Sequence, residues 1–187
     1  MSGVKNLQAS EPRPRGRLKL ALLGLFFLLP VAGSWVAWRF ELVPGAAGNY
    51  GTLLSPRPVA LPRAAVLKGK WVLVQFAGGA CDAACERKHY FMRQVRRAQG
   101  KEMQRIERLW LVTDAVPPRA ELLAALEDAV VAPAGTAAAG FPAERPVTDY
   151  IYLVDPLGNL MMRFPPDPDP ARVIKDLQRL LRASSFG

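Results

Sequence analysis

Cysteine and histidine are both scarce in this chain of 187 residues. There are two cysteines, Cys81 and Cys85, and a single histidine, His89. One pair of thiols allows at most one internal disulfide, and a metal site that uses histidine has to use His89. Acidic residues are also few, 16 against 25 Lys and Arg, so the net charge is +9. No nucleic-acid recognition motif accompanies this basic excess, so we do not expect a nucleic-acid partner.

Charge is absent from residues 20–38, which are mostly apolar. As a helix this run would be about 28 Å long, close to the hydrocarbon thickness of a bilayer. Basic residues precede it, whereas Trp35 and Trp38 lie at its far end, as interfacial aromatic residues do. We therefore expect a cytoplasmic tail at 1–17, a single-pass anchor in a bacterial inner membrane at 18–39, and a periplasmic C-terminal domain.

A cleavable signal peptide is the alternative interpretation of this segment. The apolar core at 20–29 is followed by Pro30 and by small residues at 31–33, which could form a cleavage site. The apolar run continues past that point, which favours a retained anchor. Either way the domain reaches an oxidising compartment, where a cysteine pair can persist as a disulfide.

The remaining sequence predicts a linker and one folded domain. Residues 40–60 are rich in Gly and Pro and indicate the linker, and the domain is expected at 61–183. An irregular connection is expected at 130–146. Hydrophobic periodicity and turn signals predict strands at 71–76, 109–113, 150–154 and 160–164, and helices at about 82–100, 119–128 and 170–182. This β-α-β-α-β-β-α order is that of an α/β, thioredoxin-like fold with a central mixed sheet flanked by helices.

The two cysteines lie where the first buried strand passes into a helix. Residues i and i+4 on a helix have Cα atoms roughly 6 Å apart, within the range that a disulfide bridges. The helix N-terminus favours thiolates, which are soft ligands suited to Cu(I). A structural disulfide is the alternative, but so short a loop would remove little entropy from the unfolded chain.

His89 lies four residues after Cys85. If the helix starts by Cys81, then Cys81, Cys85 and His89 share one stripe. The rise from Cys81 to His89 would be about 12 Å, too far for one compact metal site unless Cys81 bends back from the loop. His89 is therefore either a metal ligand or, as we favour from the sequence, a surface side chain on a basic helix.

Two further features have competing interpretations. Residues 86–108 contain eight Lys and Arg, which indicate either a solvated helix face or a docking surface for an acidic partner or anionic lipid. Met161 and Met162 could suggest copper, but on a hairpin strand at least one of them should belong to the core.

Three segments together resemble the Sco/SenC family: residues 69–76 (GKWVLVQF), the Cys81-x3-Cys85 pair, and residues 152–158 (YLVDPLG). Members are thioredoxin-like, membrane-tethered proteins that help to assemble the copper centre of cytochrome c oxidase. The resemblance covers roughly residues 60–183 and the anchor. It implies Cu(I) at Cys81 and Cys85, and a cytochrome c oxidase subunit or another respiratory membrane complex as partner.

The chain departs from that family at its third copper ligand. The family's histidine would fall near residues 146–148, where this sequence has none. Ordinary periplasmic thioredoxins are also similar, but they use C-x-x-C and a cis-proline, for which Pro146 is the candidate. Three functions stay open: a Sco-type factor that handles copper or acts as a thiol-disulfide reductant, a general thiol-disulfide oxidoreductase, and a non-catalytic accessory subunit.

Overall fold

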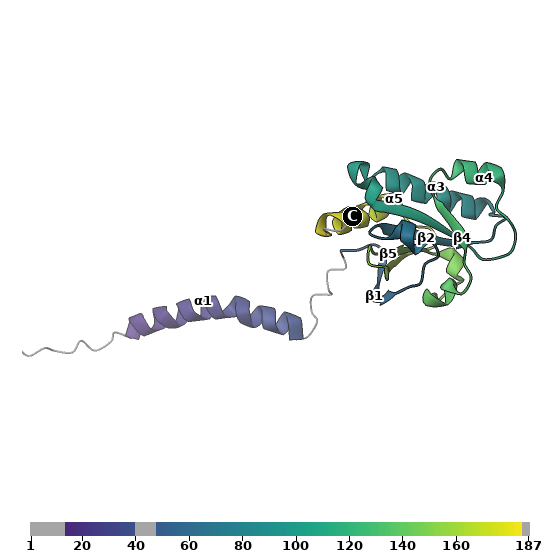
Figure 1. The fold of residues 1–187 in the computed structure, drawn as a ribbon. Helices are drawn as coiled ribbons and strands as arrows, with labels where there is room; N and C mark the ends of the chain where they lie inside the picture. Colours follow the sequence, from purple (N-terminus) through teal and green to yellow (C-terminus); the bar gives the residue numbers. More distant parts are fainter. Residues whose placement is uncertain (1–13, 40–47, 185–187) are drawn as a thin grey trace, which may run out of the picture. The chain divides into compact units, whose positions relative to one another are not determined.

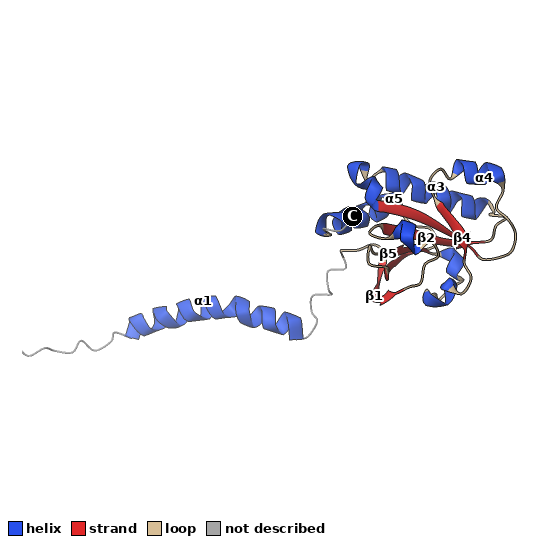
Figure 2. Cartoon of the chain, viewed as in Figure 1, coloured by secondary structure: helices blue, strands red, loops and turns tan. Residues whose placement is uncertain are grey.

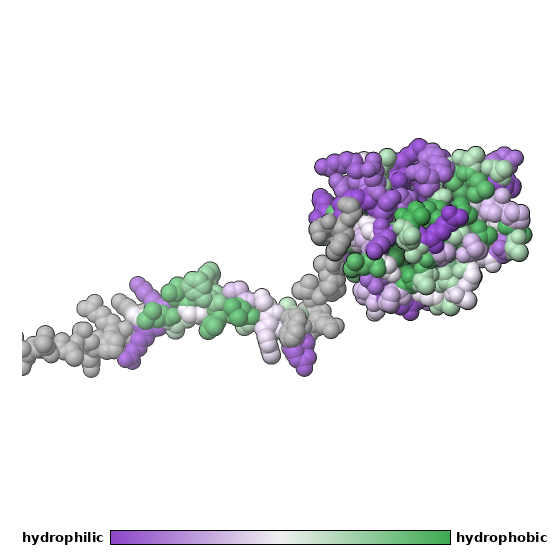
Figure 3. All heavy atoms as spheres, viewed as in Figure 1, coloured by the Kyte–Doolittle hydropathy of each residue, from purple (hydrophilic) through white to green (hydrophobic). Residues whose placement is uncertain are grey.

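The computed structural model of the protein describes residues 14–39 and 48–184 (Figure 1). The chain divides into two units, one up to Ala47 and one from Gly48 onwards. In the first unit, α1 (Pro14–Arg39) has Pro30 inside it, and its stretch Gly16–Ala37 has a mean hydropathy of 2.1. Figure 3 shows apolar side chains over much of this helix. The helix is long and apolar enough to span a membrane, a property that it shares with signal sequences.

The second unit is built on a mixed sheet of six strands, in the order β1-β6-β5-β2-β3-β4. The parallel pairs are β2 with β3 and β3 with β4, whereas β5, β6 and β1 add antiparallel neighbours. The predicted mixed sheet is thereby confirmed. The strands are β1 (Thr52–Pro58), β2 (Trp71–Ala77), β3 (Ile106–Val112), β4 (Val130–Pro133), β5 (Ile151–Val154) and β6 (Asn159–Phe164).

Helices α3 (Ala83–Arg97) and α5 (Pro170–Ala183) cover one face of this sheet (Figure 2). Successive side chains of a strand point to opposite faces, so the fully buried β2 contributes to a core on each side. Trp71 and Leu73 pack with the two helices, whereas Val74 and Phe76 pack on the other face. The remaining helical segments are α2 (Ala64–Leu67), α4 (Ala120–Ala125) and the 3-10 turns η1 (Gly100–Arg105), η2 (Ala137–Gly140) and η3 (Val147–Asp149).

Two edge strands lie where the sequence predicted irregular chain. Strand β1 occupies 52–58 within the predicted linker and pairs with β6, with Thr52 opposite Arg163. Its two prolines are compatible with an edge position, where not every N–H is needed for the sheet. Strand β4, within the connection expected at 130–146, forms the other edge beside β3. The tail 1–13 and the linker residues 40–47 lie outside the described residues.

The entry into β1 is fixed by a buried carboxylate of α5. Asp176, which is 2% exposed, accepts hydrogen bonds from Tyr50 N at 2.8 Å and Gly51 N at 2.9 Å. Gly51 lies against β6, and a Cβ at this position would come within 2.4 Å of the sulfur of Met162. Met162 is itself buried in the core, as at least one of the two methionines was predicted to be.

Candidate metal and redox site

The site begins at the turn that follows β2. Gly79 N donates to Asp114 Oδ1 at 2.9 Å, which ties the turn to the loop after β3. The two backbones are so close that a Cβ on Gly79 would lie 1.7 Å from Val116 O. Only glycine fits there, and the turn therefore delivers Cys81 to a fixed place at the end of the sheet.

Cys81 precedes the helix and is not part of it. Its φ is +41°, in the left-handed region, and Asp82 caps α3 by accepting from Cys85 N at 2.9 Å. The backbone thus folds back over the first turn of α3, and Cys81 forms a disulfide with Cys85 with their Cα atoms 5.2 Å apart. Cys81 therefore bends back from the loop, which is the condition under which the sequence allowed it to form one compact site with His89.

His89 lies beside this disulfide. One nitrogen of its imidazole and the sulfurs of Cys81 and Cys85 all lie within 4.8 Å of one another. His89 is 3% exposed, and its ring packs against Trp110 with the ring centroids 4.8 Å apart. The expectation of a surface side chain was therefore wrong, because His89 follows Cys85 by one turn and precedes buried Met92 on the inner face of α3.

The environment of His89 keeps its imidazole neutral. Burial, and to a lesser extent the positive charge of Arg108, lower the pKa of His89 to about 4. Its Nε2 is buried and has no hydrogen-bond partner among the described residues. A neutral ring with a free nitrogen and two cysteine sulfurs suits Cu(I), provided that the disulfide is first reduced. This donor set therefore fits the metal that the sequence resemblance implies.

The cysteines also line a cavity of about 360 Å³. Cys81 is 4% exposed and Cys85 7%, and both pack with Ala77, Trp110 and Val112. In the disulfide form the cysteines therefore contribute little surface to the solvent. Exposed Asp82 stands at the border of the cavity, and Gln75 at its base donates from Nε2 to Cys85 O at 3.3 Å.

The opposite wall of the cavity comes from η3, just before β5. Thr148 and Asp149 line it, and Lys88 Nζ reaches across to donate to Thr148 O at 2.5 Å. Burial lowers the pKa of Lys88, although Asp149 and Asp82 oppose the shift. The segment in which the sequence resemblance would place a histidine therefore does face the cysteines, but here it meets an ammonium group. The described residues contain no cis peptide bond, so Pro146 does not provide the cis-proline of ordinary thioredoxins.

Three contributors to this site were not among the predicted residues. Gln75 could have been noticed as a lone polar residue within a buried apolar strand. Lys88 was counted as one of many basic residues on a helix face. Arg119 had no sequence signal, although its Nη2 donates to Cys81 O at 3.3 Å and forms an ion pair with Glu86.

Comparison with known proteins relates this site to thioredoxin-like domains. The family described as "Transmembrane-like, thioredoxin-like, C-terminal domain" matches residues 71–184. No curated protein matches the chain significantly.

Solved structures of Sco proteins share the fold. Apo Sco1 from Thermus thermophilus is 21% identical with a TM-score of 0.55, and the match covers 71% of this chain and 96% of that one. Copper-bound yeast Sco1 is 16% identical with a TM-score of 0.52, covering 63% and 82%. A SCO1/SenC family lipoprotein from Bacillus anthracis is 16% identical with a TM-score of 0.51, covering 69% and 99%. At these identities the similarity establishes the predicted thioredoxin-like fold.

Proposed function

We propose that this chain, which belongs to the transmembrane-like, thioredoxin-like C-terminal domain family, is a membrane-tethered factor that handles Cu(I) for the assembly of cytochrome c oxidase. The observation that carries the proposal is the convergence of Cys81, Cys85 and His89, whose ligand atoms lie within 4.8 Å of one another. In this proposal His89 takes the place of the histidine that Sco proteins carry before the third predicted strand.

The chemistry begins with the disulfide. A partner dithiol supplies two electrons and two protons, which convert Cys81–Cys85 into two thiols while the partner becomes a disulfide. When Cu(I) binds, each thiol releases its proton and each sulfur donates to the metal. His89 has no proton to release at neutral pH, because its pKa is about 4. Transfer to a partner then exchanges these thiolates for the acceptor's thiolates, and copper stays Cu(I).

The cellular setting forms part of the same proposal. The apolar helix α1 suits a retained anchor, and the basic residues before it suit a cytoplasmic N-terminus. The domain would then work in the periplasm of a bacterial inner membrane, with an oxidase subunit or another respiratory membrane complex as its partner. The copper-bound Sco1 of yeast, which shares the fold, supports copper as the cargo.

A general thiol-disulfide oxidoreductase is the second candidate, favoured by the disulfide itself. Cys81–Cys85 lies at a helix start beside a cavity of about 360 Å³, which offers room for a substrate. In the reduced protein a cysteine thiolate would attack a substrate disulfide and form a mixed disulfide. The second thiolate would then release the substrate as a dithiol and restore Cys81–Cys85.

A copper titration separates these functions. Full-length protein in detergent, reduced under anaerobic conditions, is titrated with Cu(I) against a chromophoric chelator. We expect one tightly held copper ion, lost entirely in Cys81→Ser. Met161→Leu is the matched control, since it removes a sulfur from partly buried β6 without touching the site. Failure of the wild type to hold copper would overturn the copper function, and rapid turnover of a disulfide substrate would then support the second candidate.

A further inference from the structure

A second cavity, of about 140 Å³, lies between α3 and α4 and is lined by His89 but by neither cysteine. Residues Arg93 of α3 and Arg108 of β3 contribute its polar wall, and Leu122 and Leu126 contribute an apolar one. Exposed Glu86 and Tyr90 also line it and mark its solvent side. One buried water needs roughly 10–15 Å³ of cavity volume measured in this way. The cavity is therefore large enough to hold a small organic molecule.

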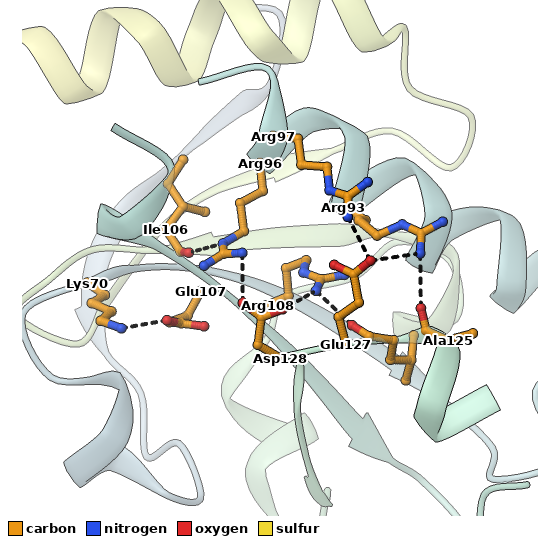
Figure 4. A network of polar contacts seen from close by, with 11 residues as sticks. Lys70, Arg93, Arg96, Arg97, Ile106, Glu107, Arg108, Ala125, Glu127 and Asp128 are labelled. Atoms are coloured by element: carbon orange, nitrogen blue, oxygen red, sulfur yellow. Dashed lines mark hydrogen bonds and ion pairs between the residues drawn. The ribbon is translucent and has the colours of Figure 1, made fainter. Parts of the chain in front are cut away.

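Arg108 is the most unusual residue of this cavity. It points from strand β3 into the layer under α3 and is only 2% exposed. Its Nη2 donates to Leu126 O at 2.8 Å, and the nearest carboxylate oxygen, Asp128 Oδ1, lies 3.7 Å away (Figure 4). A guanidinium carries five N–H donors, and Arg108 Nε has no hydrogen-bond partner among the described residues. A buried cation with unused donors calls for an acceptor.

A neighbour of Arg108 in the same cavity, Arg93, has an unused donor as well. Arg93 Nη1 donates to Ala125 O at 3.0 Å and approaches Glu127 at 3.5 Å, but its buried Nε has no partner in the described chain. The Nε groups of two arginines around one cavity thus lack an acceptor.

The surrounding charges also favour an anion. Cations outnumber carboxylates in the ion-pair network around the cavity, which Figure 4 shows in part. Four guanidinium groups, those of Arg93, Arg96, Arg97 and Arg108, share the two carboxylates of Glu127 and Asp128, while Arg119 pairs separately with Glu86. Burial lowers the pKa of Arg108, and Arg96 and Arg93 lower it further, whereas Asp128 and Glu127 oppose the shift. Arg108 is thus a buried cation that lies close to two other guanidinium groups.

We propose that this cavity binds a small monocarboxylate anion between Arg93 and Arg108. The planar fork of a guanidinium matches the two oxygens of a carboxylate, and Leu122 and Leu126 offer contact for a short alkyl group. The apolar wall of Leu122 and Leu126 offers no hydrogen bond to the further oxygens of sulfate or phosphate, which favours a carboxylate with a short alkyl group over these ions. This inference rests on residues other than the cysteines and is independent of the proposed copper function.

The test uses acetate as the probe and full-length protein in deuterated detergent at pH 7 and constant ionic strength. Saturation-transfer NMR on the acetate methyl group measures binding. We expect a saturable signal that sulfate displaces poorly, at least tenfold weaker binding in Arg93→Gln and tighter binding in Glu86→Gln. Arg97→Gln is the matched control, because Arg97 pairs with Glu127 at 2.7 Å but does not line the cavity.

Two outcomes decide the matter. Loss of binding in Arg93→Gln with retention in Arg97→Gln and in Cys81→Ser supports the site and separates it from copper chemistry. Absence of a saturable acetate signal, or equal binding in Arg93→Gln and Arg97→Gln, overturns it and leaves a cavity that holds water only.

Discussion

The two walls that face the Cys81–Cys85 disulfide differ in what they offer a metal. The α3 wall presents His89, buried and neutral, with one imidazole nitrogen near both sulfurs. The η3 wall presents Thr148, whose carbonyl oxygen accepts from Lys88 Nζ. Lys88 and His89 are consecutive, but about 100° apart around the helix, so they line different cavities. The comparison teaches that the nitrogen donor near the sulfurs comes from the helix, while the loop side carries a positive charge.

The largest expected effect concerns the neutral state of His89. Its pKa is about 4 when folded and close to 6.5 when unfolded, so the unfolded chain binds the extra proton between these values. Stability contributed by neutral His89 is complete above pH 6.5 and is lost as the pH falls to about 4. The difference amounts to about 3 kcal/mol in the free energy of unfolding.

Chemical denaturation of the full-length protein in detergent, followed by near-ultraviolet circular dichroism between pH 7.5 and pH 4, measures this dependence. His89→Phe keeps an aromatic contact with Trp110 and should remove the His89 part of the slope. An identical pH dependence in wild type and His89→Phe would show that the imidazole is not held neutral by its surroundings.

The next effect concerns copper itself. His89→Phe should weaken Cu(I) binding about 100-fold, or about 2.7 kcal/mol, because two thiolates remain but the third donor is gone. Thr148→Ala is the control from the opposite wall and should leave the affinity unchanged, since Thr148 interacts through its backbone carbonyl. Competition with a Cu(I) chelator measures both. Equal affinities in the two variants would remove His89 from the metal site.

The sequence predicted the centre of the fold better than its edges or its site. Strand β2 and the helix capped by Asp169 and Pro170 have strong local signals, an apolar run and a cap with proline at the first helical position. Strands β1 and β4 lack such signals, because edge strands tolerate proline and bury only part of their residues. Strand β1 forms because it pairs with β6, and β4 forms because it pairs with β3, in each case with residues that are distant in the sequence.

The site depended on one backbone angle that sequence periodicity does not reveal. Helical spacing from Cys81 placed His89 too far away, whereas the left-handed φ of Cys81 brings its sulfur back over the helix. The buried position of His89 did leave a trace in the sequence, because Cys85, His89 and Met92 recur at helical spacing. The many basic residues on the same helix instead favoured a solvent-exposed position for His89.

A smaller effect is expected when the loop wall is given the missing ligand. In a His89→Phe background, adding Thr148→His alone should recover little, because the ammonium of Lys88 lies at this wall and repels the cation. Adding Lys88→Met as well should recover about tenfold in Cu(I) affinity, or about 1.4 kcal/mol. The same chelator competition reports it. Full recovery without the Lys88 change would show that the charge of Lys88 does not matter.

The smallest effect concerns the cap that holds the two cysteines in register. Asp82→Ala removes the acceptor for Cys85 N and should lower the free energy of unfolding by about 1 kcal/mol. Asp169→Ala is the matched control, since it removes the cap of α5, where Asp169 Oδ1 accepts from Ala171 N at 2.8 Å, for a similar loss of stability. Only Asp82 lies beside the disulfide, where its negative charge repels the attacking thiolate of dithiothreitol. Only the Asp82→Ala change should therefore speed the reduction of the disulfide. Equal reduction rates in the two variants would mean that Asp82 acts on α3 alone and not on the chemistry of the cysteines.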